Sequence, residues 1–317
     1  RPDRTPMGSR FLVLLSACLA WLALLSPGWV WAWEIPVLPE SMRPECFITV
    51  DKASQRLTWS APCLRAAHGQ LEWACTTGQR SGDKWREGDK KTPEGVYFLT
   101  KRRSGLDEGL YGNLAFPLNY PNPVDRIQGK TGYGIWLHGR GKDLVPRDTR
   151  GCIALRTSVL RRLASRFVLQ RTPVFVGRID SPTGISPRLA RIAQRLKQRV
   201  QTWANAWEKQ HSRFFSLYEP AKFDRSDSLS FAEFKAQKKQ FFNRYAWIEV
   251  DLGSIMAVPG PGYWVTVFTQ TFRSPEYTDT GVKRLYWQKD SEQRWRIVGR
   301  EWIPAPISSG PCAVSAQ

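Results

Sequence analysis

The sequence predicts a mainly β domain followed by an α+β domain, behind an amino-terminal targeting segment. Short runs of alternating apolar and polar residues, separated by turn residues, begin at Cys46. The longest helical spacing of apolar residues begins only at Pro187, and strand-like segments follow it. Helices followed by a run of antiparallel strands are typical of α+β domains. At 317 residues the chain is long enough for two such units.

The first 32 residues have the layout of a secretory signal peptide. Arg10 precedes an almost uncharged run that ends at Trp33, and a Pro-Gly pair interrupts this run. We expect cleavage after Ala32; an uncleaved inner-membrane anchor is the alternative, because the run is long enough to span a bilayer. Export would make the protein periplasmic. There, a net charge of +19 favours anionic envelope polymers or membrane surfaces as partners, and not nucleic acid.

The cysteine count agrees with an oxidising compartment. An odd number remains after the predicted cleavage site, namely Cys46, Cys63, Cys75, Cys152 and Cys312. If Cys152 stays unpaired, the other four can form two disulfides in any of three connectivities, and the spacing does not choose among them. None of the spacings resembles a zinc site, so we expect neither a metal nor a cofactor.

The predicted elements of the first domain are mostly short strands, and the domain is expected to end near Gly177. A segment rich in proline, glycine and asparagine is predicted to be a long surface loop of the kind that lines sites, and it spans residues 109–129. Apolar spacing after Cys152 predicts a short amphipathic helix within residues 155–169. The strands are expected at residues 46–51, 55–60, 71–78, 95–100 and 172–177.

A turn-rich linker at residues 179–188 leads to the second domain, which is expected over residues 189–306. The first helix is predicted from Pro187 to about Tyr218, with arginine and lysine on its polar face. A second helix is expected at residues 230–247. The strands of a strongly curved sheet should follow, at residues 247–274, 282–290 and 295–302.

One histidine and one cysteine form a candidate catalytic pair. His138 ends a predicted strand and precedes a glycine, and Cys152 follows Gly151 immediately before the predicted helix. A nucleophilic cysteine must become a thiolate, which a neighbouring base or a helix amino terminus favours. We therefore expect the end of a strand to face the start of a helix, with the amide N–H groups near Cys152 aimed at a developing oxyanion.

The third member of such a site is left open by the sequence. A backbone carbonyl can hold an imidazole tautomer as a carboxylate does, and the carbonyl of Gly139 is the nearest candidate. Asp143 and Asp148, on the intervening loop, are the alternatives. A histidine and a cysteine at this spacing can also be unrelated, in which case Cys152 would be an inert thiol.

Four segments resemble the L,D-transpeptidase catalytic domain of the YkuD type, over about residues 44–178: "TPEGVY", "LNYPNPVD", "GKTGYGIWLHG" and "TRGCIAL". The resemblance implies a β-rich, sandwich-like fold with Cys152 as nucleophile, His138 as base and Gly139 supplying the orienting carbonyl. It also implies that Gly151, Arg150 and Tyr120 lie around the oxyanion and the substrate. Two positions depart from the family pattern.

The departures lie on either side of the nucleophile. Arg150 stands where the family usually has a second histidine, and Ala154 stands where arginine or asparagine is common. Arg150 cannot act as a base, so that task falls to His138; its guanidinium can instead bind a carboxylate.

The second domain resembles the cone-shaped nuclear transport factor 2-like (SnoaL-like) fold, through residues 200–223 and 265–302. Together the two domains resemble murein L,D-carboxypeptidases and transpeptidases that trim stem peptides in curved and helical bacteria. This implies an enzyme that acts on peptidoglycan stem peptides, with a second domain that binds or forms a homodimer. No acid–base set is apparent there, and His211 is expected to be structural. A packing role is expected for most of Trp203, Trp207, Trp264, Trp287, Trp295 and Trp302.

Overall fold

The computed structural model describes residues 33–61, 70–179 and 187–305. The predicted signal segment, most of the predicted linker, Cys63 and Cys312 lie outside these residues. In the part of the chain that the structure describes, no helix is both long and apolar enough to cross a membrane.

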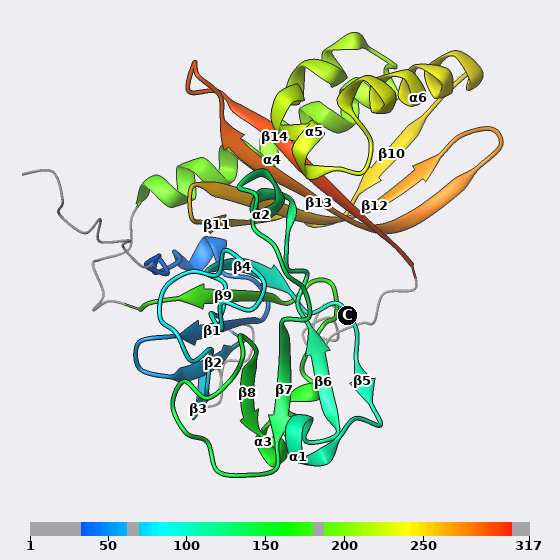
Figure 1. Ribbon diagram of the computed structural model, residues 1–317. Coiled ribbons are helices and arrows are strands. Elements are labelled where there is room, and N and C mark those ends of the chain that lie inside the picture. The colour runs from blue at the N-terminus through cyan, green and yellow to red at the C-terminus, as the bar shows by residue number, and fades with distance from the viewer. Residues whose placement is uncertain (1–32, 62–69, 180–186, 306–317) are drawn as a thin grey trace, which may run out of the picture. The chain divides into compact units, whose positions relative to one another are not determined.

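Two sheets form the first domain (Figure 1). The first has the strand order β3-β2-β1-β9-β4, with β1 antiparallel to β2 and parallel to β9. Its strands are β1 (Phe47–Asp51), β2 (Arg56–Ser60), β3 (Gln70–Ala74), β4 (Gly95–Phe98) and β9 (Pro173–Gly177). The second sheet has the order β5-β6-β7-β8. Its strands are β5 (Arg103–Ser104), β6 (Leu114–Pro117), β7 (Trp136–Arg140) and β8 (Ile153–Arg156).

Apolar side chains from both sheets form one buried core, which fixes the positions of β7 and β8. Leu137 of β7 and Ile153 of β8 are fully buried in this core, together with Ile48 and Trp59 of the first sheet. The short helices of the domain are η1 (Glu40–Met42), α1 (Glu108–Tyr111), α2 (Pro123–Ile127) and α3 (Thr157–Ala164). The predicted mainly β fold of this domain is confirmed.

The helix expected directly after Cys152 begins later than predicted. Residues Ile153–Arg156 form strand β8, which pairs in parallel with β7, and α3 begins only at Thr157. The side chains of Ile153 and Leu155 are completely buried, so pairing with β7 and core burial outweigh the helical spacing. Cys152 therefore precedes a strand, and the expected geometry of a strand end facing a helix start is wrong.

The segment 109–129 is also more regular and more buried than predicted. It contains the end of α1, all of β6 and α2, and Asn122 closes a capping box at the start of α2. Pro123 occupies the first turn, where a missing N–H costs nothing. Asn122 and Asp125 are buried, so this part of the segment is not the surface loop expected from its composition.

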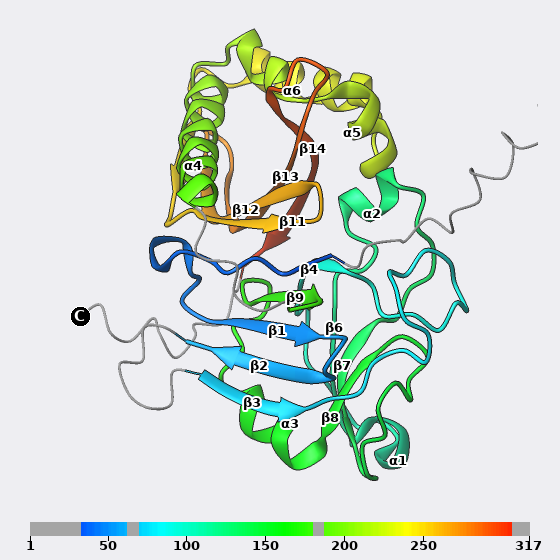
Figure 2. The ribbon, with the colours of Figure 1, turned by 90° about the vertical axis from the view of Figure 1, so that its left-hand side faces the viewer.

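The second domain consists of helices packed on a curved antiparallel sheet (Figure 2). The helices are α4 (Pro187–Glu208), η2 (Ser212–Leu217), α5 (Pro220–Ser226) and α6 (Phe231–Arg244). The sheet has the order β10-β12-β13-β14, with β11 paired to β12. Its strands are β10 (Glu249–Leu252), β11 (Met256–Gly260), β12 (Tyr263–Arg273), β13 (Thr278–Lys289) and β14 (Trp295–Pro304). The predicted α+β class is confirmed.

The first helix of this domain ends ten residues before its predicted end. Gln210 has a positive φ of 52°, which an α-helix cannot continue through. The imidazole Nδ1 of His211 then accepts a hydrogen bond of 2.9 Å from the Arg213 N–H and caps η2. His211 therefore has a structural role, as expected.

The two domains share one apolar cluster. Val96, Phe98 and Phe175 of the first sheet are buried in the same cluster as the core of the second domain. Arg284, with 1% of its surface exposed, donates hydrogen bonds to the Gln170 carbonyl at 2.6 Å and to Glu301 at 2.7 Å. Because these residues of the first sheet are buried against the second domain, the second domain stabilises that sheet.

Candidate active site

His138 lies in the middle of β7, and not at its end as predicted, because Gly139 and Arg140 continue the strand. Its ring is 95% buried and packs edge-on against Tyr111, with 5.2 Å between the ring centroids. Nδ1 lies 2.7 Å from the carbonyl oxygen of Gly139. Because a carbonyl only accepts hydrogen bonds, Nδ1 carries the proton and Nε2 keeps a free lone pair.

Cys152 precedes β8 by one residue and is partly exposed. Its Sγ donates a hydrogen bond of 3.4 Å to the Gly134 carbonyl. Thr149 shapes the turn before it: the Thr149 hydroxyl donates to the Cys152 carbonyl at 2.7 Å and accepts from the Gly151 N–H at 3.1 Å. Sequence reasoning missed this threonine, although it lies within the segment "TRGC".

The register of β7 and β8 brings the histidine and the cysteine together. Leu137 pairs with Ile153 and His138 pairs with Ala154. Since alternate residues of a strand share a face and the Leu137–Ile153 pair faces the core, His138 and Cys152 both face the opposite side. They are diagonal neighbours on that face, because Ala154, the register partner of His138, lies two residues after Cys152.

Burial favours the neutral form of both groups. It raises the pKa of the Cys152 thiol, against a backbone hydrogen bond from Trp136 and the positive charge of Lys84, which both lower it. Burial likewise lowers the pKa of His138; the Gly139 hydrogen bond opposes this change and the charge of Arg140 adds to it. A neutral imidazole beside a neutral thiol is the starting state that a general base and a nucleophile require.

The aspartates considered as third members do not contact His138. Asp148 forms an ion pair with Arg140 at 2.6 Å, and Asp143 forms one with Arg156 at 3.0 Å. Among these candidates, only the Gly139 carbonyl lies within hydrogen-bonding distance of the imidazole.

The other predicted site residues lie in three different environments. Arg150 is exposed two residues before Cys152, and it has no ion pair among the described residues. The Gly151 N–H is already bonded to Thr149, so it is not free to bind an oxyanion without a rearrangement. Tyr120 is 6% exposed and its hydroxyl donates to the Thr131 carbonyl at 3.1 Å, which braces the segment that leads into β7.

The structure describes three of the five cysteines that follow the predicted cleavage site. Cys46, Cys75 and Cys152 are free thiols. Cys46 and Cys75 flank opposite ends of the β1–β2–β3 meander, where β1 begins and β3 ends, and both are buried. Burial raises the pKa of the Cys75 thiol to about 12 and also raises that of Cys46. Cys152 is therefore the one partly exposed thiol among the described residues.

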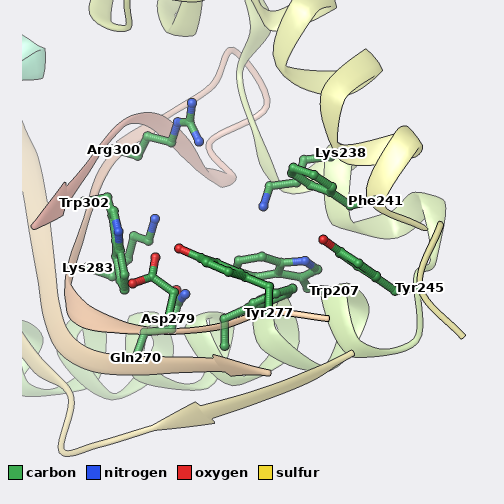
Figure 3. A pocket seen from close by; sticks show the side chains of 11 residues that line it. Trp207, Lys238, Phe241, Tyr245, Gln270, Tyr277, Asp279, Lys283, Arg300 and Trp302 are labelled. Carbon is green, nitrogen blue, oxygen red and sulfur yellow. The ribbon is translucent and has the colours of Figure 1, made fainter. Parts of the chain in front are cut away.

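A cavity of about 230 Å³ lies in the second domain, away from Cys152 (Figure 3). The amines of Lys238 of α6 and Lys283 of β13 lie near the aromatic rings of Trp207, Tyr277 and Trp302. Arg300 of β14 also lines the cavity, but its guanidinium is directed away from these rings. The Lys238 Nζ lies 3.8 Å from the Trp207 ring centroid, and the Lys283 Nζ lies 4.8 Å from that of Trp302. Two of the six tryptophans expected to serve in packing therefore line a cavity.

The cavity cations are poorly solvated. Burial lowers the pKa of Lys283 to about 7, and the charge of Arg300 acts in the same direction. Burial also lowers the pKa of Lys238, and the charges of Lys283 and Arg300 add to this effect. Arg300 is paired with Asp227 at 2.8 Å, and Asp279 also lines the cavity. Because Arg300 is already paired, the two lysines face one carboxylate, that of Asp279, and an anionic ligand would stabilise their charged forms.

Each of the two domains matches a known protein family. Residues 46–176 match the model of the L,D-transpeptidase catalytic domain, YkuD, and residues 195–301 match that of the Cds6 C-terminal NTF2-like domain. The structure is similar to that of Bd1075 from Bdellovibrio bacteriovorus, with 30% identity, a TM-score of 0.61, and coverage of 87% of this chain and 98% of that one. The protein belongs to the YkuD-type L,D-transpeptidase family.

A second solved structure is similar to this chain over both domains. The helical cell shape determining protein Pgp2 from Campylobacter jejuni is 29% identical, with a TM-score of 0.61, and the match covers 81% of this chain and 91% of that one. A comparison with curated protein sequences gives no match. The resemblance of the first domain, seen in the four sequence segments, and that of the second domain, seen in residues 200–223 and 265–302, are thus both confirmed.

Proposed function

We propose that this protein is an exported enzyme that cleaves the bond between the L-centre of diaminopimelate and D-alanine in the tetrapeptide stems of peptidoglycan. The observation that supports the proposal is the diagonal placement of His138 and Cys152 on one face of β7 and β8, in a domain of the YkuD type. The family makes an envelope location the natural one, and we place the protein in the periplasm.

The reaction follows from the two side chains. The His138 Nε2 takes the thiol proton as the Cys152 Sγ attacks the carbonyl carbon, and Gly139 holds the resulting imidazolium through Nδ1. The C–N bond then breaks, and the amine of D-alanine leaves with the proton from His138. This gives a thioester between the shortened stem and Cys152.

The second half of the reaction regenerates the enzyme. Water, or an amine of a second stem, attacks the thioester carbonyl and gives its proton to His138, which returns it to the departing sulfur. Attack by water makes the protein an L,D-carboxypeptidase, and attack by an amine makes it an L,D-transpeptidase. Arg150, exposed beside the nucleophile, is positioned to bind a substrate carboxylate.

Purified tetrapeptide muropeptides test the proposal and its acceptor together. After incubation with the mature protein, mass spectrometry should detect tripeptide monomers if water is the acceptor, or 3-3 cross-linked dimers if an amine is. A covalent adduct on the Cys152 peptide, captured by rapid acid quenching, should accompany turnover. Unchanged tetrapeptide and no adduct would rule out both enzyme activities.

The alternative function is a non-catalytic protein that holds peptidoglycan through its basic surface. Its supporting observation is the cationic, aromatic cavity of the second domain. This cavity does not compete with the catalytic proposal, because we also propose that it binds a carboxylate-bearing part of the same polymer and orients it. Murein binding without turnover by the intact protein would favour the binding function alone.

The relative Pgp2 is described as determining helical cell shape. We propose that this protein likewise acts on cell shape, because trimming stems changes how many remain available for cross-linking. Deletion of the gene in the source bacterium, and complementation with the Cys152→Ala variant, would test this. Full rescue of cell shape by that variant would separate the shape function from catalysis.

A further inference from the structure

A buried ammonium lies in the loop that forms one wall of the nucleophile site. Lys84 is only 3% exposed, although lysine is among the residues least often buried. Its Nζ donates to the Arg86 carbonyl at 2.9 Å and to the Asp89 Oδ1 at 2.8 Å. Burying a cation in this way costs free energy even when it is paired, which makes its position beside the site notable.

One series of contacts leads from Lys84 to the residue before the nucleophile. The Asp89 Oδ1 that accepts from Lys84 also accepts from the Lys91 N–H at 3.0 Å. The Lys91 carbonyl in turn lies so close to Gly151 that a Cβ on that glycine would be 2.8 Å from its oxygen. The loop therefore packs directly against the turn that carries Cys152.

A second series of contacts reaches the nucleophile from the opposite side. A Cβ on Gly132 would lie 3.4 Å from the Lys84 Cε, so the lysine stem packs against the segment before β7. Two residues later in that segment, the Gly134 carbonyl accepts the hydrogen bond from the Cys152 Sγ. The two series of contacts both begin at Lys84, and they end at Gly151 and at Cys152.

Lys84 has an ionised partner in Asp89, but of these two charges only that of Lys84 acts on the pKa of the Cys152 thiol. Burial works against ionisation of Asp89, yet hydrogen bonds from Lys84 and three backbone N–H groups hold its pKa at about 2. Its carboxylate accepts from the N–H groups of Trp85, Arg86 and Lys91 as well as from the Lys84 ammonium. The other titratable or charged groups near Cys152 are His138, on the same face of the paired strands, and Arg150, two residues earlier in the chain.

We propose that Lys84 is a positioning residue whose buried ammonium stabilises the thiolate of Cys152 and so sets how readily the nucleophile forms. The inference rests on the proposed function for its purpose, because only an acyl-transfer enzyme needs that thiolate. The interaction is stronger than it would be at the surface, since the surrounding protein screens it less than water does. The lowering effect of Lys84 on the pKa of the Cys152 thiol has the sign that this role requires.

The test uses thiol alkylation, which needs no substrate. The rate of iodoacetamide modification is measured between about pH 6 and pH 10 by mass spectrometry of the peptide that contains Cys152, so that the other cysteines do not interfere. In Lys84→Met we expect the rate near neutral pH to fall about three- to tenfold, with the profile moved to higher pH. The matched control is Lys90→Met, which removes the same charge from an exposed position of the same loop. Equal profiles for Lys84→Met and the unmodified protein would overturn the proposal.

A second variant separates electrostatics from loop anchoring and decides the matter if Lys84→Met does not fold. Asp89→Asn removes the partner but keeps the ammonium. We expect alkylation of Cys152 to be as fast as in the unmodified protein, or faster. A decrease of threefold or more, in a variant with an unchanged circular dichroism spectrum, would mean that Lys84 only anchors the loop and would overturn the inference.

These outcomes are independent of the proposed function. An alkylation shift in Lys84→Met together with an intact protein that turns over no muropeptide would refute the enzyme and keep the role of Lys84. Normal turnover of muropeptides with no alkylation shift would keep the enzyme function and refute the role of Lys84.

Discussion

His138 and Cys152 are diagonal neighbours on one face of two parallel strands. This follows from the pairing of His138 with Ala154 and from the position of Cys152 one residue before Ile153. The opposite face of the same strands is anchored by the fully buried side chains of Leu137 and Ile153. Core packing on one side therefore fixes the geometry of the reactive groups on the other.

Replacing the nucleophile tests catalysis without disturbing this frame. Cys152→Ala should abolish conversion of tetrapeptide muropeptides, while binding to sedimented murein is retained because the side chain is small and partly exposed. The matched control is Cys75→Ala, which removes a buried thiol outside the site. An unaltered rate in Cys152→Ala would refute the thioester mechanism.

The pH dependence of turnover should reflect the shifted pKa of the base. Burial lowers the pKa of His138 below its usual value of about 6.5. The imidazole therefore stays neutral at lower pH than that of an ordinary histidine. The acid limb of kcat/KM should therefore fall off below about pH 6.5. Measured rates that already decline between pH 7 and pH 8 as pH falls would contradict the assignment of His138 as base.

Gly151 should not tolerate a side chain. It has a φ of +133°, and a Cβ there would meet the Lys91 carbonyl at 2.8 Å, so Gly151→Ala should displace Cys152. We expect a cost of about 1–3 kcal/mol in unfolding free energy and a large loss of turnover. The control is Gly88→Ala, which also has a positive φ, of +75°, but has open space around its Cβ. Equal effects of the two changes on turnover would show that close packing against Lys91 does not matter.

The cavity of the second domain should bind anions more weakly as pH rises. Since the pKa of Lys283 is lowered to about 7, its charge is present below that pH and is lost above it. Binding of soluble muropeptides, measured by calorimetry, should weaken between about pH 6 and pH 8, and Lys283→Met should remove this dependence. Lys239→Met, an exposed lysine on the same helix as Lys238, is the control. The idea fails if Lys283→Met binds as the unmodified protein does.

Arg284 should be important for stability through contacts between the domains. It is 1% exposed and bonds both to Glu301 and to Gln170. Arg284→Met would leave Glu301 without its ion-pair partner, so we expect a loss of about 3–5 kcal/mol in unfolding free energy by urea denaturation. Arg294→Met removes a half-exposed guanidinium and leaves Asp290 paired with Arg296, so it should cost less than about 1 kcal/mol.

Much of the fold was predictable because local patterns carried it. The alternation in residues 47–51 and 57–59 predicted two strands, and both are present, although β2 buries Leu57, Thr58 and Trp59 in a row and not one face only. Helical spacing likewise predicted α4, although its end depended on Gln210 and the cap at His211, which the apolar pattern does not encode. The α5 helix was not predicted, because its seven residues are too few to show a helical period.

The sequence by itself determined the family and the candidate pair, because His138, Gly139 and Cys152 lie within short motifs whose order and spacing are visible along the chain. Only the tertiary structure decided that Cys152 precedes a strand, since that depends on burial of Ile153 and Leu155 against a sheet that is distant in the sequence. It also decided that Lys84 packs against the segment before β7 and that Lys238 and Lys283 share a cavity. Such relationships arise from long-range packing, which brings together residues that no local pattern connects.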